Sequence, residues 1–386
     1  MPSITGVDEC RPLRRLPRSR IMRAAVLAAA GGLVLGFLPS AASAAPLSAR
    51  PTIVAGPAVT AYAYANKPTS HSYTPEKDYS YNSTGETIRI TKSGPGEYTV
   101  DFDGLGAYAD QGTVDVSPEG FGAAVCSVTS WGPDSTGTIL QVGVDCYALS
   151  GTRMNDYFEV AFTSGGSTSG TTDYVWANDS TAKSYTPNRD HQFNSSGGTN
   201  TIEKLGKGQY EVTMPGPVAT DGTVKVTAYG TTSDACETDG WSAESPGQEV
   251  DVDCFNKAGQ AANDRFTMTF TAANDLLGDG GASGYVWANE PSSSSYVPDT
   301  LYQYDTVGTQ ASVIMFTTGQ WEVAFPSAGQ GDTGDEQVTA YGSDDTHCVE
   351  DGPAGAVGGT ESGDVYCFDN SGNPVNDYYT MQWLVN

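Results

Sequence analysis

The sequence predicts an all-β protein made of three tandem β-sandwich domains of Greek-key or jelly-roll type, each closed by one disulfide. Three observations lead to this prediction: the composition, an internal repeat, and two cysteines in every repeat. The 386 residues include 46 Gly, 21 Pro and 21 Tyr. Aromatic and β-branched residues alternate with polar ones between the Gly and Pro positions, a pattern typical of strands joined by turns.

The N-terminal segment, residues 1–44, is expected to be a signal peptide. Six arginines precede the apolar stretch 24–38, and Ala42-Ser43-Ala44 fits the small-residue rule for signal-peptidase cleavage. The apolar stretch is shorter than the roughly 20 residues that span a bilayer. Met22 is an alternative start that would leave a leader of ordinary length. We therefore expect cleavage near Ala44 and a secreted, extracellular protein without membrane insertion.

Three copies of one series of phrases follow the leader. Asn66, Asn178 and Asn289 end the phrases YAYAN, YVWAN and YVWAN, so the repeat length is 112 and then 111 residues. A unit of this length can bury its own core, and the Gly/Ser stretches between units are typical of flexible linkers. The predicted boundaries are 45–58 for an N-terminal linker, 59–163, 173–271 and 285–386 for the three domains, and 164–172 and 272–284 for the linkers between them.

Each repeat contains the same predicted strands in the same order. The Tyr-x-x-Ala-Asn strand comes first, and a Ser-Tyr-x-Pro phrase and an alternating pair of ring-bearing residues follow it. A Gly-x-aromatic-x-Val strand and a Val-rich strand come next, and a strictly alternating segment ends the repeat, which predicts a strand with one buried face. The tyrosines of the Ser-Tyr-x-Pro phrases are Tyr73, Tyr185 and Tyr296. The Gly-x-aromatic-x-Val strands are 96–100, 208–212 and 319–323, and the clearest Val-rich strands are 224–230 and 338–342. The alternating segments at the end of the repeats are 158–162, 266–270 and 379–383.

The cysteines predict one disulfide in every repeat. Cys10 lies in the leader, and an even count in an exported chain favours disulfides over metal binding. Each loop of about 20 residues would stabilise the fold by about 3 kcal/mol in the chain-entropy model. No thiol then remains for catalysis. The predicted pairs are Cys126–Cys146, Cys236–Cys254 and Cys348–Cys367.

The second cysteine of each repeat begins a phrase with a glycine five residues later and Asn-Asp at nine and ten. Three Asn-Asp pairs could be three binding sites or three copies of one turn. A glycine at a fixed position is typical of a backbone site with positive φ, and Asn or Asp commonly closes such a turn. We therefore expect Asp156, Asp264 and Asp377 to accept hydrogen bonds from backbone amides at the start of the last strand.

The charge of the chain excludes whole classes of partner. The chain has 19 Lys and Arg residues and 46 Asp and Glu residues, of which six Arg and two acidic residues lie before residue 45. The remainder of the chain therefore has 13 basic and 44 acidic residues and a net charge of −31. Nucleic-acid binding is not expected, because its affinity comes mainly from neutralised phosphates. Docking on anionic lipid is not expected for the same reason. High negative charge is typical of soluble proteins and also permits attraction of cations or of a basic partner.

Catalytic and metal-binding residues are not predicted. His71, His191 and His347 lie at non-equivalent positions of the repeat, and no nucleophile motif accompanies them. Asp145 and Asp253 precede the second cysteine where the third repeat has Tyr366, which favours a solvent-facing strand position over a catalytic one. Acidic segments that lack the ligand spacing of a calcium loop make calcium a weak alternative to no cofactor. They are 275–279, 332–336 and 344–345.

The best binding-site candidates are Trp131 and Trp241, each five residues after the first cysteine of its repeat. A tryptophan on a loop can form a flat platform for a sugar ring. Alternatively, it covers the disulfide, as large aromatic residues do in sandwich domains. The third repeat has Pro353 at this position. The other tryptophans lie in alternating strand patterns and are expected in the cores; they are Trp176, Trp287, Trp321 and Trp383.

Taken together, these phrases resemble a repeat of secreted bacterial proteins that is common in actinobacteria, over essentially the whole chain after the leader. The resemblance implies export and β-rich domains and supplies no catalytic residues. We expect a non-enzymatic binding or cell-surface protein, with a glycan or another surface component as the partner of the disulfide loops. The alternative is an extracellular polysaccharide hydrolase with a carboxylate pair. A third hypothesis, an inhibitor of secreted proteases, has no residue that singles it out.

Overall fold

The structure is a computed structural model that describes residues 58–166, 170–216, 221–276, 281–328, 334–352 and 355–385. The predicted signal peptide, Cys10 and Pro353 lie outside the described residues. All described residues belong to one compact unit. No helix among them is long and apolar enough to cross a membrane.

The all-β prediction is confirmed, with three β-sandwiches and one disulfide in each. In every repeat a layer of four strands packs on a layer of five strands, to which repeat 3 adds a sixth strand. In repeat 1 the strands are β1 (Val59–Tyr64), β2 (Ser72–Tyr73), β3 (Ser80–Asn82), β4 (Ile88–Gly94), β5 (Glu97–Asp103), β6 (Thr113–Glu119), β7 (Ala124–Pro133), β8 (Ile139–Ala148) and β9 (Tyr157–Ser164).

Repeats 2 and 3 follow the same order. Repeat 2 contains β10 (Thr171–Ala177), β11 (Ser184–Tyr185), β12 (Gln192–Asn194), β13 (Thr201–Gly206), β14 (Gln209–Pro215), β15 (Thr223–Tyr229), β16 (Ala235–Glu244), β17 (Gly247–Phe255) and β18 (Arg265–Ala272). Repeat 3 contains β19 (Ala282–Ala288), β20 (Ser295–Tyr296), β21 (Gln303–Asp305), β22 (Ser312–Thr317), β23 (Gln320–Phe325), β24 (Asp335–Tyr341), β25 (Thr346–Glu350), β26 (Gly355–Val357), β27 (Thr360–Asp369) and β28 (Tyr378–Val385).

Alternation along the strands builds the three cores, because successive side chains point to opposite faces of a sheet. In β5, Tyr98, Val100 and Phe102 are buried while the residues between them are half-exposed. The first and last long strands of each repeat pair antiparallel, β1 with β9, β10 with β18 and β19 with β28. Each repeat is thereby closed by its own ends.

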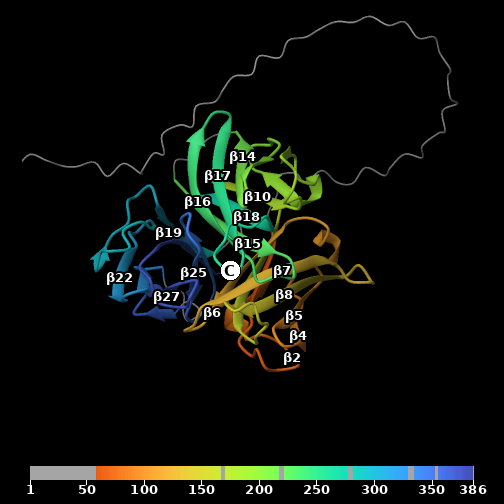
Figure 1. The fold of residues 1–386 in the computed structure, drawn as a ribbon. Helices are drawn as coiled ribbons and strands as arrows, with labels where there is room; N and C mark the ends of the chain where they lie inside the picture. Colours follow the sequence, from red (N-terminus) through yellow and green to blue (C-terminus); the bar gives the residue numbers. More distant parts are fainter. Residues whose placement is uncertain are drawn as a thin grey trace, which may run out of the picture. The chain divides into compact units, whose positions relative to one another are not determined.

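The sheets do not stop at the limits of a repeat. The five-stranded sheet of repeat 1 continues through β7 and β15 into the four-stranded sheet of repeat 2 (Figure 1). In the same way β16 joins β24, and β25 joins β6, which returns from repeat 3 to repeat 1. The three junctions therefore form a closed cycle. At each junction the amide of the glycine that follows β6, β15 or β24 donates to a carbonyl of the neighbouring repeat. Gly120 donates to Glu350 at 2.7 Å, and Gly230 to Val128 and Gly342 to Thr238 at 2.9 Å.

The inner strands β6, β15 and β24 contact one another at the centre of this cycle. A ring of three hydrogen bonds connects them. The Val116 N–H donates to Thr227 Oγ1 at 2.9 Å, Val226 N–H to Thr339 Oγ1 at 3.2 Å, and Val338 N–H to Ser117 Oγ at 2.8 Å. Threonine and serine on the inner faces of these strands, which look solvent-facing in a single repeat, are buried because the repeats cover one another.

The Cys-Gly-Asn-Asp phrase is confirmed as a structural turn. Its glycine has a φ of +80°, +68° and +79° in the three repeats, a region that favours glycine. Its Asn side chain accepts from the glycine that opens the preceding Gly-x-aromatic strand, at 3.0, 3.0 and 2.8 Å. Asp156, Asp264 and Asp377 accept from the backbone amide that follows them, at 3.1, 2.8 and 2.7 Å.

Two expectations about side-chain placement are wrong. Trp321 and Trp383 are fully buried in the core of repeat 3, but Trp176 and Trp287 project from β10 and β19 toward the preceding repeat and pack at the junctions. Their environment depends on a neighbouring repeat, which the pattern within one repeat does not contain.

Candidate functional site

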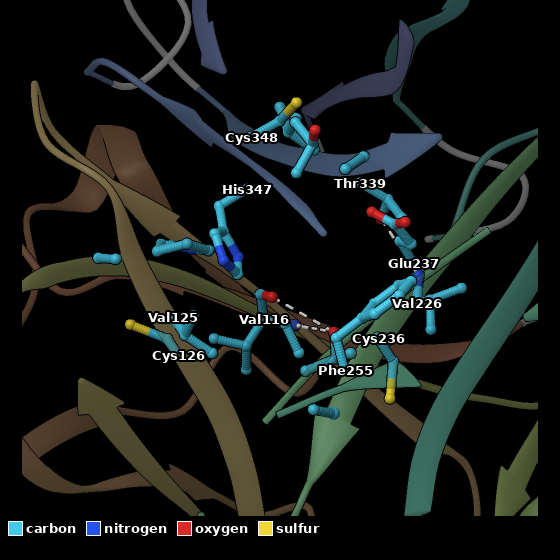
Figure 2. Close-up of a pocket in the computed structure, with 18 of the residues that line it drawn as sticks. Val116, Val125, Cys126, Val226, Cys236, Glu237, Phe255, Thr339, His347 and Cys348 are labelled. Atoms are coloured by element: carbon cyan, nitrogen blue, oxygen red, sulfur yellow. Dashed lines mark hydrogen bonds between the residues drawn. The ribbon is translucent and has the colours of Figure 1, made fainter. Parts of the chain in front are cut away.

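A pocket of ≈ 60 Å³ lies where the three repeats meet, at the cysteine end of the inner strands. Figure 2 shows that it takes residues from every repeat. Its walls include the first cysteine of each disulfide and the ends of β6, β15 and β24. The residues lining it are Val116, Pro118, Ala124, Val125, Cys126, Val226, Thr227, Ala228, Ala235, Cys236, Glu237, Phe255, Val338, Thr339, Ala340, Asp345, Thr346, His347 and Cys348.

Three titratable side chains break the symmetry of this lining: Glu237, Asp345 and His347. His347 precedes the first cysteine of repeat 3, where repeats 1 and 2 have Val125 and Ala235. Figure 2 shows the imidazole of His347 and the side chain of Glu237 on opposite sides of the space between the repeats. The titratable groups of the pocket therefore lie on two opposite sides.

Glu237 lies on β16, next to Cys236, and is 3% exposed. Burial raises the pKa of its carboxyl group well above the usual range, and the carboxylates of Asp344, Asp377 and Asp345 raise it further. Its Oε1 atom makes no hydrogen bond within the described residues. A buried carboxylate is costly without a partner of opposite charge, so these surroundings favour the protonated Glu237 carboxyl group unless a cation lies beside it.

His347 and Asp345 form the opposite side of the pocket. The His347 Nε2 atom lies 3.5 Å from Asp345 Oδ1 and makes no hydrogen bond within the described part of the chain. Burial lowers the pKa of His347 to about 4, although a hydrogen bond with the Asn370 side chain opposes this. Burial and the neighbouring Asp344 raise the pKa of Asp345 to about 6. His347 is therefore a neutral imidazole at neutral pH, and Asp345 is mainly ionised.

The turns that follow the second cysteines surround this end of the structure. The Lys257 side chain lies against Gly151, so the turns of repeats 1 and 2 are in contact. The Asn370 side chain donates to the Lys257 carbonyl at 3.4 Å, which joins repeats 2 and 3. The turns that contain the three Asn-Asp pairs thus stabilise each repeat internally and also connect the repeats to one another.

Trp131 and Trp241 lie on the hairpins β7–β8 and β16–β17, and each is packed against the next repeat. The Trp131 ring centroid is 5.1 Å from those of Trp176 and His191 and 5.6 Å from that of Tyr229. Trp241 has the same relation to repeat 3, with Trp287 and Tyr341 both at 5.7 Å. Both tryptophans remain partly exposed. The structure does not bring them together with each other or with the pocket.

Two further expectations are corrected. Asp145 and Asp253 are each only 6% exposed, so their strand position does not face solvent; Arg153 pairs with Asp145 at 2.6 Å. The predicted acidic segment 332–336 is not a loop at its C-terminal end, because Asp335 and Glu336 begin β24 and are buried. Among the described residues, no three His, Cys, Asp or Glu side chains are close enough to hold a metal ion.

Sequence reasoning missed the pocket residue Glu237, and it named His347 and the segment 344–345 without assigning them to a pocket. One signal could have indicated them, since Glu237 and His347 replace apolar or small residues beside a cysteine that the other repeats keep. No protein-family model, curated protein or solved structure matches this chain.

Proposed function

We propose that this chain is a secreted, non-enzymatic binding protein whose central pocket takes a primary ammonium group, such as the end of a lysine side chain or a small amine. The observation that carries the proposal is the buried Glu237 carboxyl group, which faces an open pocket, has further carboxylates nearby and lacks a hydrogen bond on Oε1. The three disulfides support export, because such bonds persist in oxidising compartments.

The chemistry of the lining favours an ammonium group over a metal ion. Calcium needs several oxygen ligands at about 2.3–2.6 Å, and no three suitable side chains of the described residues converge in that way. An ammonium group has three N–H donors that reach acceptors at about 2.8 Å, so it can connect more widely spaced groups. The Glu237 and Asp345 carboxylates and the neutral imidazole of His347 are such acceptors.

The size of the pocket limits the ligand. Sites for sugars and other drug-sized ligands measure about 300–1,000 Å³, whereas this pocket is ≈ 60 Å³. A pocket of this size does not favour the polysaccharide hydrolase, which must hold a sugar ring between its two carboxyl groups. The volume suits a methylammonium or the end of a lysine side chain.

Titration calorimetry at constant ionic strength with methylammonium chloride tests the proposal. The best small ligands gain about 1.5 kcal/mol per non-hydrogen atom, so methylammonium should bind with a Kd of roughly 10 mM. The Glu237→Gln variant should bind at least tenfold more weakly. Glu244→Gln, an exposed position on the same strand β16, should bind like the natural protein.

Two further ligands distinguish the alternatives. Tetramethylammonium has no N–H donor and should not bind, and calcium chloride should give no saturable heat. Equal methylammonium binding by the natural protein and by Glu237→Gln would refute the assignment of the site. Saturable binding of calcium instead of methylammonium would refute the ammonium chemistry.

A further inference from the structure

The three junctions between repeats are built from equivalent strands but not from equivalent side chains. At the junctions of repeats 1 and 2 and of repeats 2 and 3, aromatic rings fill the interface, among them Tyr229 and Tyr341 at the ends of β15 and β24. At the junction of repeats 3 and 1 the equivalent residue is Glu119, at the end of β6. We call this third interface the carboxyl junction.

Six positions at or beside the carboxyl junction hold an acid where the other repeats hold something else. The strand registers establish the equivalence. The acids, with their counterparts in the other repeats, are Glu119 (Tyr229, Tyr341), Glu159 (Thr267, Thr380), Asp335 (Thr113, Thr223), Glu336 (Val114, Val224), Glu350 (Val128, Thr238) and Glu361 (Leu140, Gln248). All six are at most 2% exposed.

The acids come from both repeats and lie close together. Glu119 and Glu350 are direct partners in the pairing of β6 with β25. The Glu336 N–H donates to the Glu159 carboxylate across the junction. None of the four carboxylate oxygens of Glu336 and Glu350 makes a hydrogen bond within the described residues. Because these side chains are buried and face other acids, ionising several of them at once is unfavourable.

A second substitution shows that the fold accommodates the acid specifically. A Cβ atom at position 363 would overlap the Glu336 carboxylate, and position 363 is a glycine. The equivalent pairs across the sandwich are Val114 with Val142 in repeat 1 and Val224 with Val250 in repeat 2. Repeat 3 has exchanged Val-Val for Glu-Gly, so the larger side chain is matched by a smaller one opposite it.

We propose that the carboxyl junction is a pH-dependent contact, which is closed while its acids are protonated and opens when they ionise. Protonated carboxyl groups can donate hydrogen bonds to one another, whereas several carboxylates in one buried space repel. At the other two junctions aromatic rings hold the places equivalent to Glu119, and the single buried acid Glu237 lies at the junction of repeats 2 and 3. These two junctions hold the remaining contacts of the cycle in either state. Opening therefore separates β25 from β6 without separating the three repeats from one another.

Titratable groups from eight strands face the carboxyl junction. The titratable groups that face the junction are Tyr64 on β1, Asp115 and Glu119 on β6, Asp156, Tyr157 and Glu159 at the start of β9, Lys225 on β15, Asp335 and Glu336 on β24, Glu350 and Asp351 at the end of β25, Glu361, Asp364 and Tyr366 on β27, and Tyr379 on β28. Lys225 is the only cation in this set, and burial holds its pKa well below the usual range.

The sign of the pH dependence follows from these surroundings. Burial, followed by the neighbouring carboxylates, raises the pKa of Glu159, Glu336 and Glu350 well above 4.5. Burial raises the pKa of Asp335 to about 7 and that of Glu119 to about 8. The contribution of such groups to stability is fully present below the pKa of the unfolded chain and is lost as pH rises through the folded-state values. The junction should loosen as pH rises from about 4.5, the ordinary value for Glu, through the folded-state values of about 7 and about 8.

The three junction amides of Gly120, Gly230 and Gly342 provide the test, because each donates across one junction of the same molecule. Hydrogen exchange of the full chain is measured by NMR at pH 5 and pH 8.5, with rates corrected for the intrinsic effect of pH. The protection of the Gly120 amide should fall at least tenfold. The Gly230 amide should change by less than twofold. The Gly342 amide, which donates to the residue beside Glu237, should lose less protection than the Gly120 amide.

Variants then assign the effect to the acids. In Glu336→Gln with Glu350→Gln, which keeps the shape of the side chains, the Gly120 amide should lose its pH dependence. In Glu336→Val with Gly363→Val, which restores the pair of repeats 1 and 2, the dependence should weaken. Equal responses of all three amides, a Gly120 amide that ignores pH, or an unchanged response in the Gln variant would each overturn the proposal. If the variants do not fold, the comparison of the three amides in the natural protein still decides.

Discussion

Replacing Trp131 by alanine separates the two roles considered for this residue. At the junction of repeats 1 and 2 its ring contacts three others from repeat 2. A tryptophan side chain can bury about 150–250 Å². Taking about 120 Å² for this partly exposed ring, at about 25 cal/mol per Å², gives a loss of about 3 kcal/mol in the free energy of unfolding. A glycan platform predicts instead that stability hardly changes.

Urea unfolding followed by far-UV circular dichroism measures the loss without relying on tryptophan fluorescence. Phe316→Ala is the matched control, because Phe316 on β22 is 55% exposed and its removal should change stability by at most about 0.5 kcal/mol. The same variants are applied to a glycan array. A Trp131→Ala protein with unchanged stability and lost glycan binding would refute the junction role. A destabilised variant with an unchanged array signal would refute the platform.

Two other predictions follow from single contacts. Asn263→Ala removes the side-chain acceptor of the Gly208 N–H, which lies at 3.0 Å, so the free energy of unfolding should fall by about 1–2 kcal/mol. Asn155→Ala removes the equivalent 3.0 Å contact to the Gly96 N–H and should cause a similar loss. A twofold difference between the two losses in urea unfolding would argue against a shared turn. Burial lowers the pKa of His347 to about 4 from an ordinary 6.5, so the folded state binds fewer protons and stability should fall as pH drops from 6.5 toward 4; an imidazole titration by NMR with a midpoint above 6 would contradict this.

Features that lie within one repeat could be predicted from the sequence. The strand order, the three disulfides and the role of Asp264 depend on residues that are close together in the chain or paired inside one sandwich. Turn chemistry and a period of two are local signals. They recur three times in this chain, and each copy supports the other two.

Features that depend on contact between repeats could not be predicted. Thr227 looks solvent-facing by alternation, yet it is buried because it accepts from Val116 of another repeat. Charged residues are rarely buried, and the sequence indicates an acidic loop at 332–336, whereas Glu336 is buried in β24. Glu336 is equivalent in the repeat to Val114 and Val224, and this equivalence is the sequence signal that indicates its burial. A residue that breaks an apolar position shared by the other copies is therefore informative even where its chemistry suggests the surface.

The single chain explains how one junction can differ from the other two. In a homotrimer with the same contacts, symmetry would place every junction residue at all three interfaces. Acids equivalent to Glu119, Glu336 and Glu350 would then occur three times, and every interface would be subject to the same repulsion at neutral pH. In the tandem arrangement the acids occur once, while Tyr229 and Tyr341 hold the equivalent places elsewhere. Covalent repetition thus permits a cluster of acids at one junction of a cycle whose other two junctions hold aromatic rings at the equivalent places.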